Sequence, residues 1–198
     1  MAISLTRPKR LDRLSCVNTI LRAAGEDEVS NLGDGATESA LKAASTLASY
    51  STAVQSEGWT FCTEDSLRLT PNSSGEVYLP ENLLTLEPTD YSTFEKLQDR
   101  GGRLYDASSS SFRFSGPVYI KAILALPFDE LPQPAAWYIT ILATLAYING
   151  ETPGDASLRP KNMEAEQAKI ALERYDSRLR KGSLKDKNPH FRRVRRSR

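Results

Sequence analysis

The chain has 198 residues, which is enough for one domain with a substantial core or for two small ones. Its hydrophobic content of 39% and charged content of 26% are typical of a soluble globular protein, and no apolar run approaches the roughly 20 residues of a membrane span. The net charge of +1 conceals an uneven distribution: residues 178–198 hold ten Lys and Arg against one Asp, or +9, and the remaining 16 bases and 24 acids give −8. An acidic body argues against a broad nucleic-acid-binding surface, because phosphate neutralisation supplies most non-specific affinity.

Two helices are predicted at the start of the chain. The first ends at Gly25, and the second runs from a cap at Thr37 to a stop at Gly58. The second helix is rich in Ala and Ser, which suits close helix packing. The predicted apolar stripes are Leu11, Leu14, Val17, Leu21 and Ala24 in the first helix, and Leu41, Ala44, Leu47 or Ala48, Tyr50 or Ser51, and Val54 in the second.

Short runs of β-forming residues, broken by turn residues, follow from Trp59 to about Pro127. Gly101 and Gly102 predict a hairpin turn, and the alternation of Phe112 and Phe114 predicts a strand. The serine run 108–111 is expected at a flexible hairpin tip. The region is therefore predicted to form small antiparallel sheets, with Trp59 and Phe61 both pointing into a β-core.

Helical patterns return after Pro132 and Pro134. The segment 135–150 is apolar almost all round and predicts a buried central helix. The next segment, 156–181, predicts an amphipathic helix of about 39 Å that ends at Gly182. Its predicted apolar face holds Met163, Gln167, Ile170, Ala171, Arg174 and Leu179.

The order of these elements predicts an α+β fold, a four-helix bundle with an inserted small antiparallel β domain and an extended basic C-terminal arm. We expect the first half of the bundle at 9–57, the β-rich insert at 58–129, the second half of the bundle at 130–182 and the arm at 183–198. None of the four helices can bury its apolar stripe alone, which is why the two helix pairs are expected to pack together.

The sequence offers little catalytic chemistry. His190 is the single histidine and stands in the basic tail, and the two cysteines, Cys16 and Cys62, are expected to be free thiols, so no metal or cofactor is predicted. Local carboxylate pairs, Glu64–Asp65, Glu87 with Asp90, and Asp129–Glu130, are interpreted as solvated charges rather than a glycosidase site. A base-stacking platform of Trp59, Phe61, Tyr105, Phe112 and Phe114 is the alternative to a β-core.

Four segments in register, SCVNTILRAAGEDEVSNL (15–32), VQSEGWTF (54–61), RGGRLYD (100–106) and FDELP (128–132), resemble the tail tubular protein A family of short-tailed bacteriophages. Gly58, Trp59 and Phe61 are interpreted as the exit from the second helix, and Gly101, Gly102 and Tyr105 as a hairpin. FDELP is interpreted as the start of the third helix, with Asp129 and Glu130 near its positive N-terminus and Pro132 in its first turn. The chain departs from the family at Cys62, where the family often has an asparagine.

The resemblance implies a virion adaptor that is not an enzyme: a homo-oligomeric ring, usually of twelve copies, between the portal protein of the capsid and the tail nozzle, with phage DNA passing through the lumen. It implies a virion tail protein that is assembled in the host bacterial cytoplasm and does not enter a membrane. Two alternatives stay open from the residues. One is a nucleic-acid-binding module that acts through the basic arm, and the other is a tail-associated glycan hydrolase.

The arm is interpreted as a portal-docking segment. Ordering residues 188–198 costs about 1–2 kcal/mol each in backbone entropy, and exposed ion pairs return only about 0.2–1 kcal/mol each. Burial of Phe191 and Val194 is therefore expected to contribute as well, and a protein surface offers the pockets that DNA lacks. The predicted docking residues are His190, Phe191, Arg192, Arg193, Val194, Arg195, Arg196 and Arg198.

Overall fold

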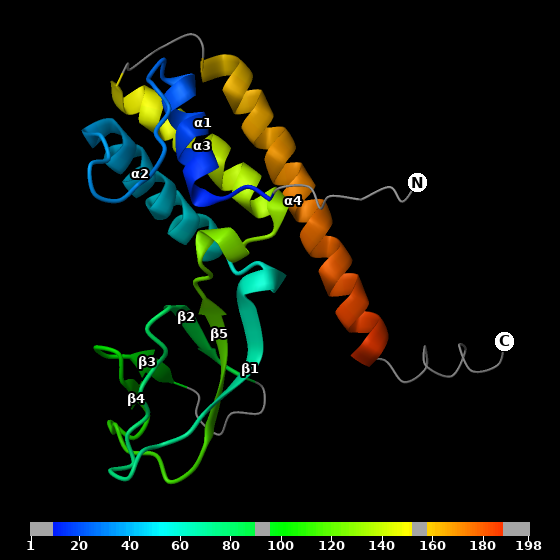
Figure 1. The fold of residues 1–198 in the computed structure, drawn as a ribbon. Helices are drawn as coiled ribbons and strands as arrows, with labels where there is room; N and C mark the ends of the chain where they lie inside the picture. The colour runs from blue at the N-terminus through cyan, green and yellow to red at the C-terminus, as the bar shows by residue number, and fades with distance from the viewer. Residues whose placement is uncertain (1–9, 90–95, 152–157, 188–198) are drawn as a thin grey trace, which may run out of the picture. The chain divides into compact units, whose positions relative to one another are not determined.

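A computed structural model of the chain describes residues 10–89, 96–151 and 158–187. The fold is α+β, with four helices and small antiparallel sheets, as predicted (Figure 1). The residues form two compact units: unit 1 comprises 1–51 and 127–198, and unit 2 comprises 52–126. The helices are α1 (Arg13–Ala23), α2 (Glu38–Gln55), α3 (Gln133–Glu151) and α4 (Leu158–Lys187), with short 3-10 turns at Thr60–Cys62 and Phe128–Glu130.

The predicted ends of the first two helices are confirmed. Asp12 and Ser15 form a capping box at the start of α1, and Gly25 follows the helix with φ of +79°. The Thr37 hydroxyl accepts a hydrogen bond from the Ala40 amide at 3.2 Å and caps α2. The predicted stripe of α2 is confirmed at Ala44, Leu47, Ser51 and Val54, which are all buried. It is wrong at Leu41, which is 51% exposed, and the fully buried Ala40 and Ala43 take its place.

The third helix, α3, is buried on nearly every side, which confirms its predicted central position. It packs against α1 and α4, and Figure 1 shows it between them. Its ten buried residues include two threonines, Thr140 and Thr144, whose hydroxyls donate to the carbonyls of Ala136 and Thr140, both at 2.7 Å. The polar atoms on this helix are thereby satisfied without water.

The predicted face of the last helix is wrong. Small side chains, Ala165 and Ala168, together with Leu172, make the buried face of α4, and Met163 and Ile170 remain 65% and 45% exposed. The reason is the distance between the two helices. Alanines let α4 approach the apolar surface of α3 closely, and the larger Met163 and Ile170 side chains would not fit in such a contact.

The predicted end of this helix at Gly182 is also wrong, since α4 continues to Lys187 and reaches about 45 Å. Glycine inside a helix costs only about 1 kcal/mol, and the flanking Lys181, Leu184 and Lys185 are good helix formers. A stronger stop comes later, because Pro189 restricts the backbone of Asn188. The first five residues assigned to the arm, 183–187, therefore belong to the helix.

Unit 2 contains five strands in two sheets. A three-stranded antiparallel sheet has the order β1 (Thr63–Leu69), β5 (Val118–Leu124), β2 (Leu83–Pro88), and β3 (Leu97–Asp99) pairs with β4 (Leu104–Asp106). A bulge interrupts the pairing of β1 with β5 between Glu64 and Leu67. The core of this unit is formed by Leu69, Val77, Leu79, Leu97, Leu104, Phe114, Val118, Ile120 and Ala122.

The hairpin at Gly101 and Gly102 is confirmed: both glycines have positive φ, +67° and +76°, between the paired residues Asp99 and Leu104. The predicted strand at Phe112 and Phe114 is wrong, because this segment makes only isolated bridges, such as Arg113 with Glu76. Phe114 is nevertheless buried against the core.

The serine run forms a defined turn around one carboxylate. Asp106 is buried and accepts hydrogen bonds from the Ser108 amide at 2.9 Å and the Ser109 hydroxyl at 2.6 Å. The Ser109 hydrogen bond, ahead of the others, lowers the pKa of Asp106 below its usual value. Ser110 takes a φ of +52° to close the turn.

The two ends of unit 2 are joined by one side chain, Gln55. Its carbonyl oxygen accepts from the Leu126 amide at 2.7 Å, and its amide nitrogen donates to the Leu126 carbonyl at 3.2 Å. Gln55 is 1% exposed, so both hydrogen bonds are shielded from water.

The segment after Gln55 packs around the same place. Gly58 has a φ of +78°, and a Cβ there would lie 3.0 Å from a carbon of Ile123. The buried Trp59 donates its indole N–H to the Val54 carbonyl at 2.9 Å, and the Cys62 thiol donates to the Trp59 carbonyl at 3.3 Å. Phe61 lies in a 3-10 turn and is only half-buried, so the period-two argument that placed it beside Trp59 in a strand was wrong.

The start of α3 differs from the prediction in the positions of Pro132 and Asp129. Pro132 precedes the helix, and its carbonyl accepts from the Ala135 and Ala136 amides at 2.9 and 3.0 Å. Asp129 accepts from the Arg13 amide at 2.9 Å, so its charge stands at the positive end of α1 and not of its own helix. The 3-10 turn and the buried Leu131 turn this carboxylate away from α3.

We expect Gln55→Met to destabilise the protein by about 1–3 kcal/mol, because it would leave the part-buried N–H and C=O of Leu126 without the Gln55 partner while preserving side-chain volume. Gln167→Met, on the exposed face of α4, is the matched control and should change the free energy of unfolding by less than about 0.5 kcal/mol. Urea unfolding of both variants measures the difference, and equal stabilities would show that the Gln55 hydrogen bonds contribute nothing.

Candidate assembly surfaces

The described residues hold no group of three or more His, Cys, Asp or Glu side chains that could bind a metal. Cys16 and Cys62 form no disulfide, as predicted, and both are buried. Burial raises the pKa of the Cys16 thiol and so disfavours its reactive thiolate. No helix within the described ranges is long and apolar enough to cross a membrane.

The carboxylate pairs considered from the sequence are separated by other interactions. Glu87 makes an ion pair with Lys121 at 2.9 Å, and its sequence neighbour Asp90 lies outside the described residues. Asp129 is bound to the start of α1, while Glu64 and Asp65 are exposed on β1. These positions favour structural roles over a glycan-cleaving pair.

The predicted docking residues His190, Phe191, Arg192, Arg193, Val194, Arg195, Arg196 and Arg198 all lie outside the described part of the chain. The structure instead shows surfaces that the sequence reasoning missed or assigned differently. Three of them stand out by composition: the outer face of α4, an acidic end of unit 1, and a cluster of arginines and aromatic rings in unit 2.

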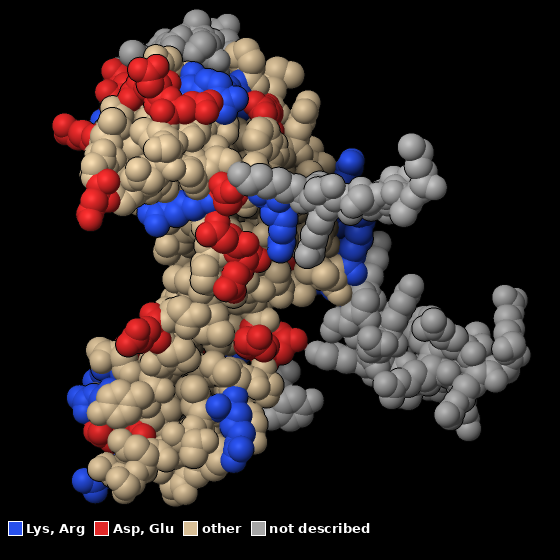
Figure 2. Space-filling view, in the orientation of Figure 1, with Lys and Arg blue, Asp and Glu red and all other residues tan. Residues whose placement is uncertain are grey.

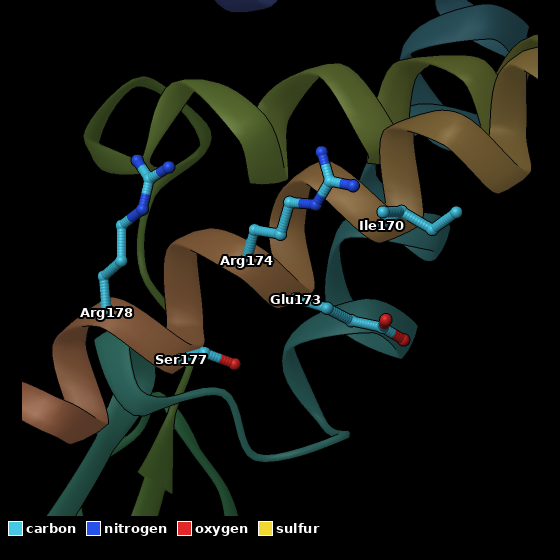
Figure 3. Close-up of a pocket in the computed structure, with 5 residues that line it drawn as sticks. All are labelled: Ile170, Glu173, Arg174, Ser177 and Arg178. Carbon is cyan, nitrogen blue, oxygen red and sulfur yellow. The ribbon is translucent and has the colours of Figure 1, made fainter.

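The outer face of α4 is a mixed apolar and charged surface. Ile170, Glu173, Arg174, Ser177 and Arg178 line an open depression of about 440 Å³ (Figure 3). The Arg174 and Arg178 side chains extend in the same direction, one helical turn apart, and Ile170, Glu173 and Ser177 lie on the adjoining side of the helix. Such an open face, with exposed Met163 two turns before Ile170, suits another protein better than a small ligand.

The acidic end of unit 1 lies where α1 ends, α2 begins and α3 ends, and Figure 2 shows acidic side chains gathered there. Tyr147 of α3 donates its hydroxyl to Glu26 at 2.8 Å, and Lys42 of α2 pairs with Glu151. The Lys42 ammonium also stands 5.8 Å from the Tyr147 ring centroid. Burial, and then the hydrogen bond to Glu26, raises the pKa of Tyr147 to about 12.

The arginine–aromatic cluster, defined as Arg100, Arg103, Tyr105 and Phe112, covers one side of the β3–β4 hairpin. The Arg100 guanidinium lies 3.6 Å from the Tyr105 ring centroid, and that of Arg103 lies 4.6 Å from the Phe112 centroid. The two rings contact each other at 4.8 Å between centroids. Arg103 also pairs with Glu76 at 2.9 Å. The sequence signal was the RGGRLYD motif, whose hairpin puts Arg103 and Tyr105 on one face.

The structure separates the five aromatic residues of the stacking hypothesis. Trp59 and Phe114 belong to buried packing, Phe61 is half-buried in its turn, and Tyr105 and Phe112 contact each other beneath the two guanidinium groups. A row of free ring faces, which base stacking requires, is therefore absent from these five described residues.

Comparison with known proteins identifies a family and a relative of this chain. A family model described as tail tubular protein matches residues 14–182. A protein named tail tubular protein A, from Klebsiella phage KP34, is 30% identical over 185 residues, a stretch that covers 93% of this chain and 97% of the phage protein.

We expect Tyr147→Phe to lower stability at pH 7 by about 1.5 kcal/mol, because it removes a hydrogen bond to a carboxylate. Since folding raises the pKa of Tyr147 from 10.0 to about 12, the protonated phenol stabilises the fold below pH 10, and this contribution is lost as the pH rises through about 12. In the Tyr147→Phe variant, the free energy of unfolding should therefore fall less between pH 10 and about 12 than it does in the parent. The control is Tyr78→Phe at a 61% exposed position, and parallel pH–stability curves for parent and Tyr147→Phe would contradict the prediction.

Proposed function

This chain belongs to the tail tubular protein family and is a structural component of a phage tail, and from that premise we propose that it is a ring-forming adaptor. In this proposal about twelve copies surround a channel, join the portal protein of the capsid to the tail nozzle, and let phage DNA pass through the lumen. The protein acts mechanically, through contacts, and takes no cofactor.

The observation that best supports assembly is the outer face of α4. Met163 and Ile170 are 65% and 45% exposed on a helix whose opposite face buries Ala165, Ala168 and Leu172. Apolar side chains on a structured helix, flanked by arginines such as Arg174 and Arg178, have the composition of a protein–protein interface. We assign this face to contacts within the assembled tail.

The charge distribution supports passage of DNA rather than its retention. Residues 1–177 carry −8, and like charge on a channel wall keeps a polyanion from adhering. The basic residues are concentrated from Arg178 onward, where α4 leads into the arm. We propose that the arm binds the portal protein, with Phe191 and Val194 buried in the partner and the arginines paired with its acceptors.

We expect the purified protein, mixed with the purified portal protein of the same phage, to form a complex whose mass corresponds to a ring on the portal. Ile170→Glu should leave the melting temperature within about 2 °C, because the side chain is exposed, but should reduce the assembled mass. Leu41→Glu, at a similarly exposed apolar position on α2, is the control. A protein that stays monomeric on the portal would refute the adaptor function.

We expect deletion of residues 188–198 to leave the melting temperature unchanged and to prevent binding to the portal. Phe191→Ala should weaken that binding at least as much as Arg196→Ala, because apolar burial contributes about 1.5–3 kcal/mol and exposed ion pairs about 0.2–1 kcal/mol each. Titration against immobilised portal protein measures both effects. Should the truncated chain still bind portal while arginine variants lose only salt-sensitive DNA binding, the arm is a nucleic-acid contact.

A further inference from the structure

We infer that the arginine–aromatic cluster of unit 2 binds the acidic β1 side of unit 2 in a second copy of this chain, in a head-to-tail contact that repeats around the ring. This inference rests on the proposed ring and specifies which surfaces meet in it. Neither surface belongs to the outer face of α4 or to the C-terminal arm.

The cluster presents guanidinium groups whose positions are already fixed. Arg100 stacks on Tyr105 and donates one hydrogen bond, to the Gln98 side chain at 3.2 Å. A guanidinium has five N–H donors, and within the described residues no carboxylate pairs with Arg100, so its remaining donors face solvent. Stacking holds the group in place and thereby reduces the conformational entropy lost when an acceptor binds.

The chemistry of the cluster selects a carboxylate partner over a nucleic acid base. The Tyr105 and Phe112 rings contact each other and are covered by Arg100 and Arg103, which leaves no open ring face for stacking. Glu76 already pairs with Arg103, so Arg100 is the guanidinium of the cluster that can bind a carboxylate of a partner. Exposed Tyr78 and the arginines together resemble the residue types enriched at the centres of protein interfaces.

The opposite surface carries the complementary charge. Between Ala43 and Leu67 the sequence has no Lys or Arg but contains Glu57, Glu64 and Asp65. All three are exposed, and Glu64 and Asp65 stand on β1 at the bulge in its pairing with β5. β1 is also an edge strand, so this side of the sheet is accessible to a neighbouring chain.

Within unit 2 the two surfaces lie on opposite sides. The order of the main sheet is β1, β5, β2, and β3 contacts β2, so the β3–β4 hairpin lies beyond the far edge from β1 (Figure 1). Two different, complementary patches on opposite sides give a heterologous contact, and such contacts close into a ring when the rotation between copies allows it. A contact of like patches would instead stop at a dimer.

The test is a charge exchange between the two surfaces, measured by mass photometry of the purified protein alone and on the purified portal. Arg100→Glu and Glu64→Lys should each raise the protein concentration for half-maximal assembly by roughly tenfold, since each places like charges together. The double variant Arg100→Glu with Glu64→Lys should restore assembly to within about threefold of the parent. Melting temperatures confirm that each variant is folded.

Arg13→Glu is the matched control, because it makes the same change of charge at an exposed position of α1 in unit 1, which contributes no residue to either surface, and it should not weaken assembly. The inference is overturned if Arg100→Glu assembles like the parent, if the folded double variant is no better than the single ones, or if Arg100→Glu lowers only DNA binding. These results would leave the proposed function intact. A parent chain that forms no oligomer even on the portal would instead refute both the inferred contact and the proposed adaptor function.

Discussion

The pairing of the Gln55 side chain with the backbone of Leu126 is the constraint on which the inserted unit depends. A domain inserted between two helices needs its two ends side by side, and here a single buried amide makes both hydrogen bonds that join them. Gly58 supports the same closure, since its left-handed backbone turns the chain where a Cβ would meet Ile123. Trp59 then fills the turn and donates to the Val54 carbonyl, so that a buried side chain holds the turn that follows α2.

In unit 1 the corresponding constraint is the apolar surface of α3. Because this helix is buried on nearly all sides, the other helices need only small contact residues, and α4 uses Ala165, Ala168 and Leu172. The bulky and charged residues of α4 are thereby left on its outer face, where Met163 and Ile170 remain exposed. The packing that stabilises the subunit is thus also what makes a surface available for assembly, and this is the link between the fold and the proposed ring.

Much of the fold could be predicted because its signals are local. Gly25, Gly58 and the Gly101–Gly102 pair each require a positive φ, and the apolar run of α3 has no other use than burial. The face of α4 could not be predicted in the same way, since the choice between an alanine stripe and a Met–Ile stripe depends on how closely α3 is approached. Gln55 stands inside the VQSEGWTF motif, but its role could not be predicted, because its partner is 71 residues away and is a backbone group. The arginine–aromatic cluster was visible only in part, through a hairpin motif that says nothing of Phe112.

The proposed lateral contact between units 2 and the proposed docking of the arm differ in their free-energy costs. This difference indicates an order of assembly. Exposed ion pairs contribute only about 0.2–1 kcal/mol each, so a side contact between units 2 is weak by itself even when stacking has fixed Arg100 in place. The arm must lose about 1–2 kcal/mol per residue in backbone entropy on docking, which only a partner with apolar pockets repays. Copies that bind adjacent sites of one portal, however, would be held at a high effective concentration relative to each other. Weak lateral contacts between them would then be sufficient. In the proposed assembly, a portal template would therefore make the ring form where it is needed, while the same weak lateral contacts would limit polymerisation of the free subunit.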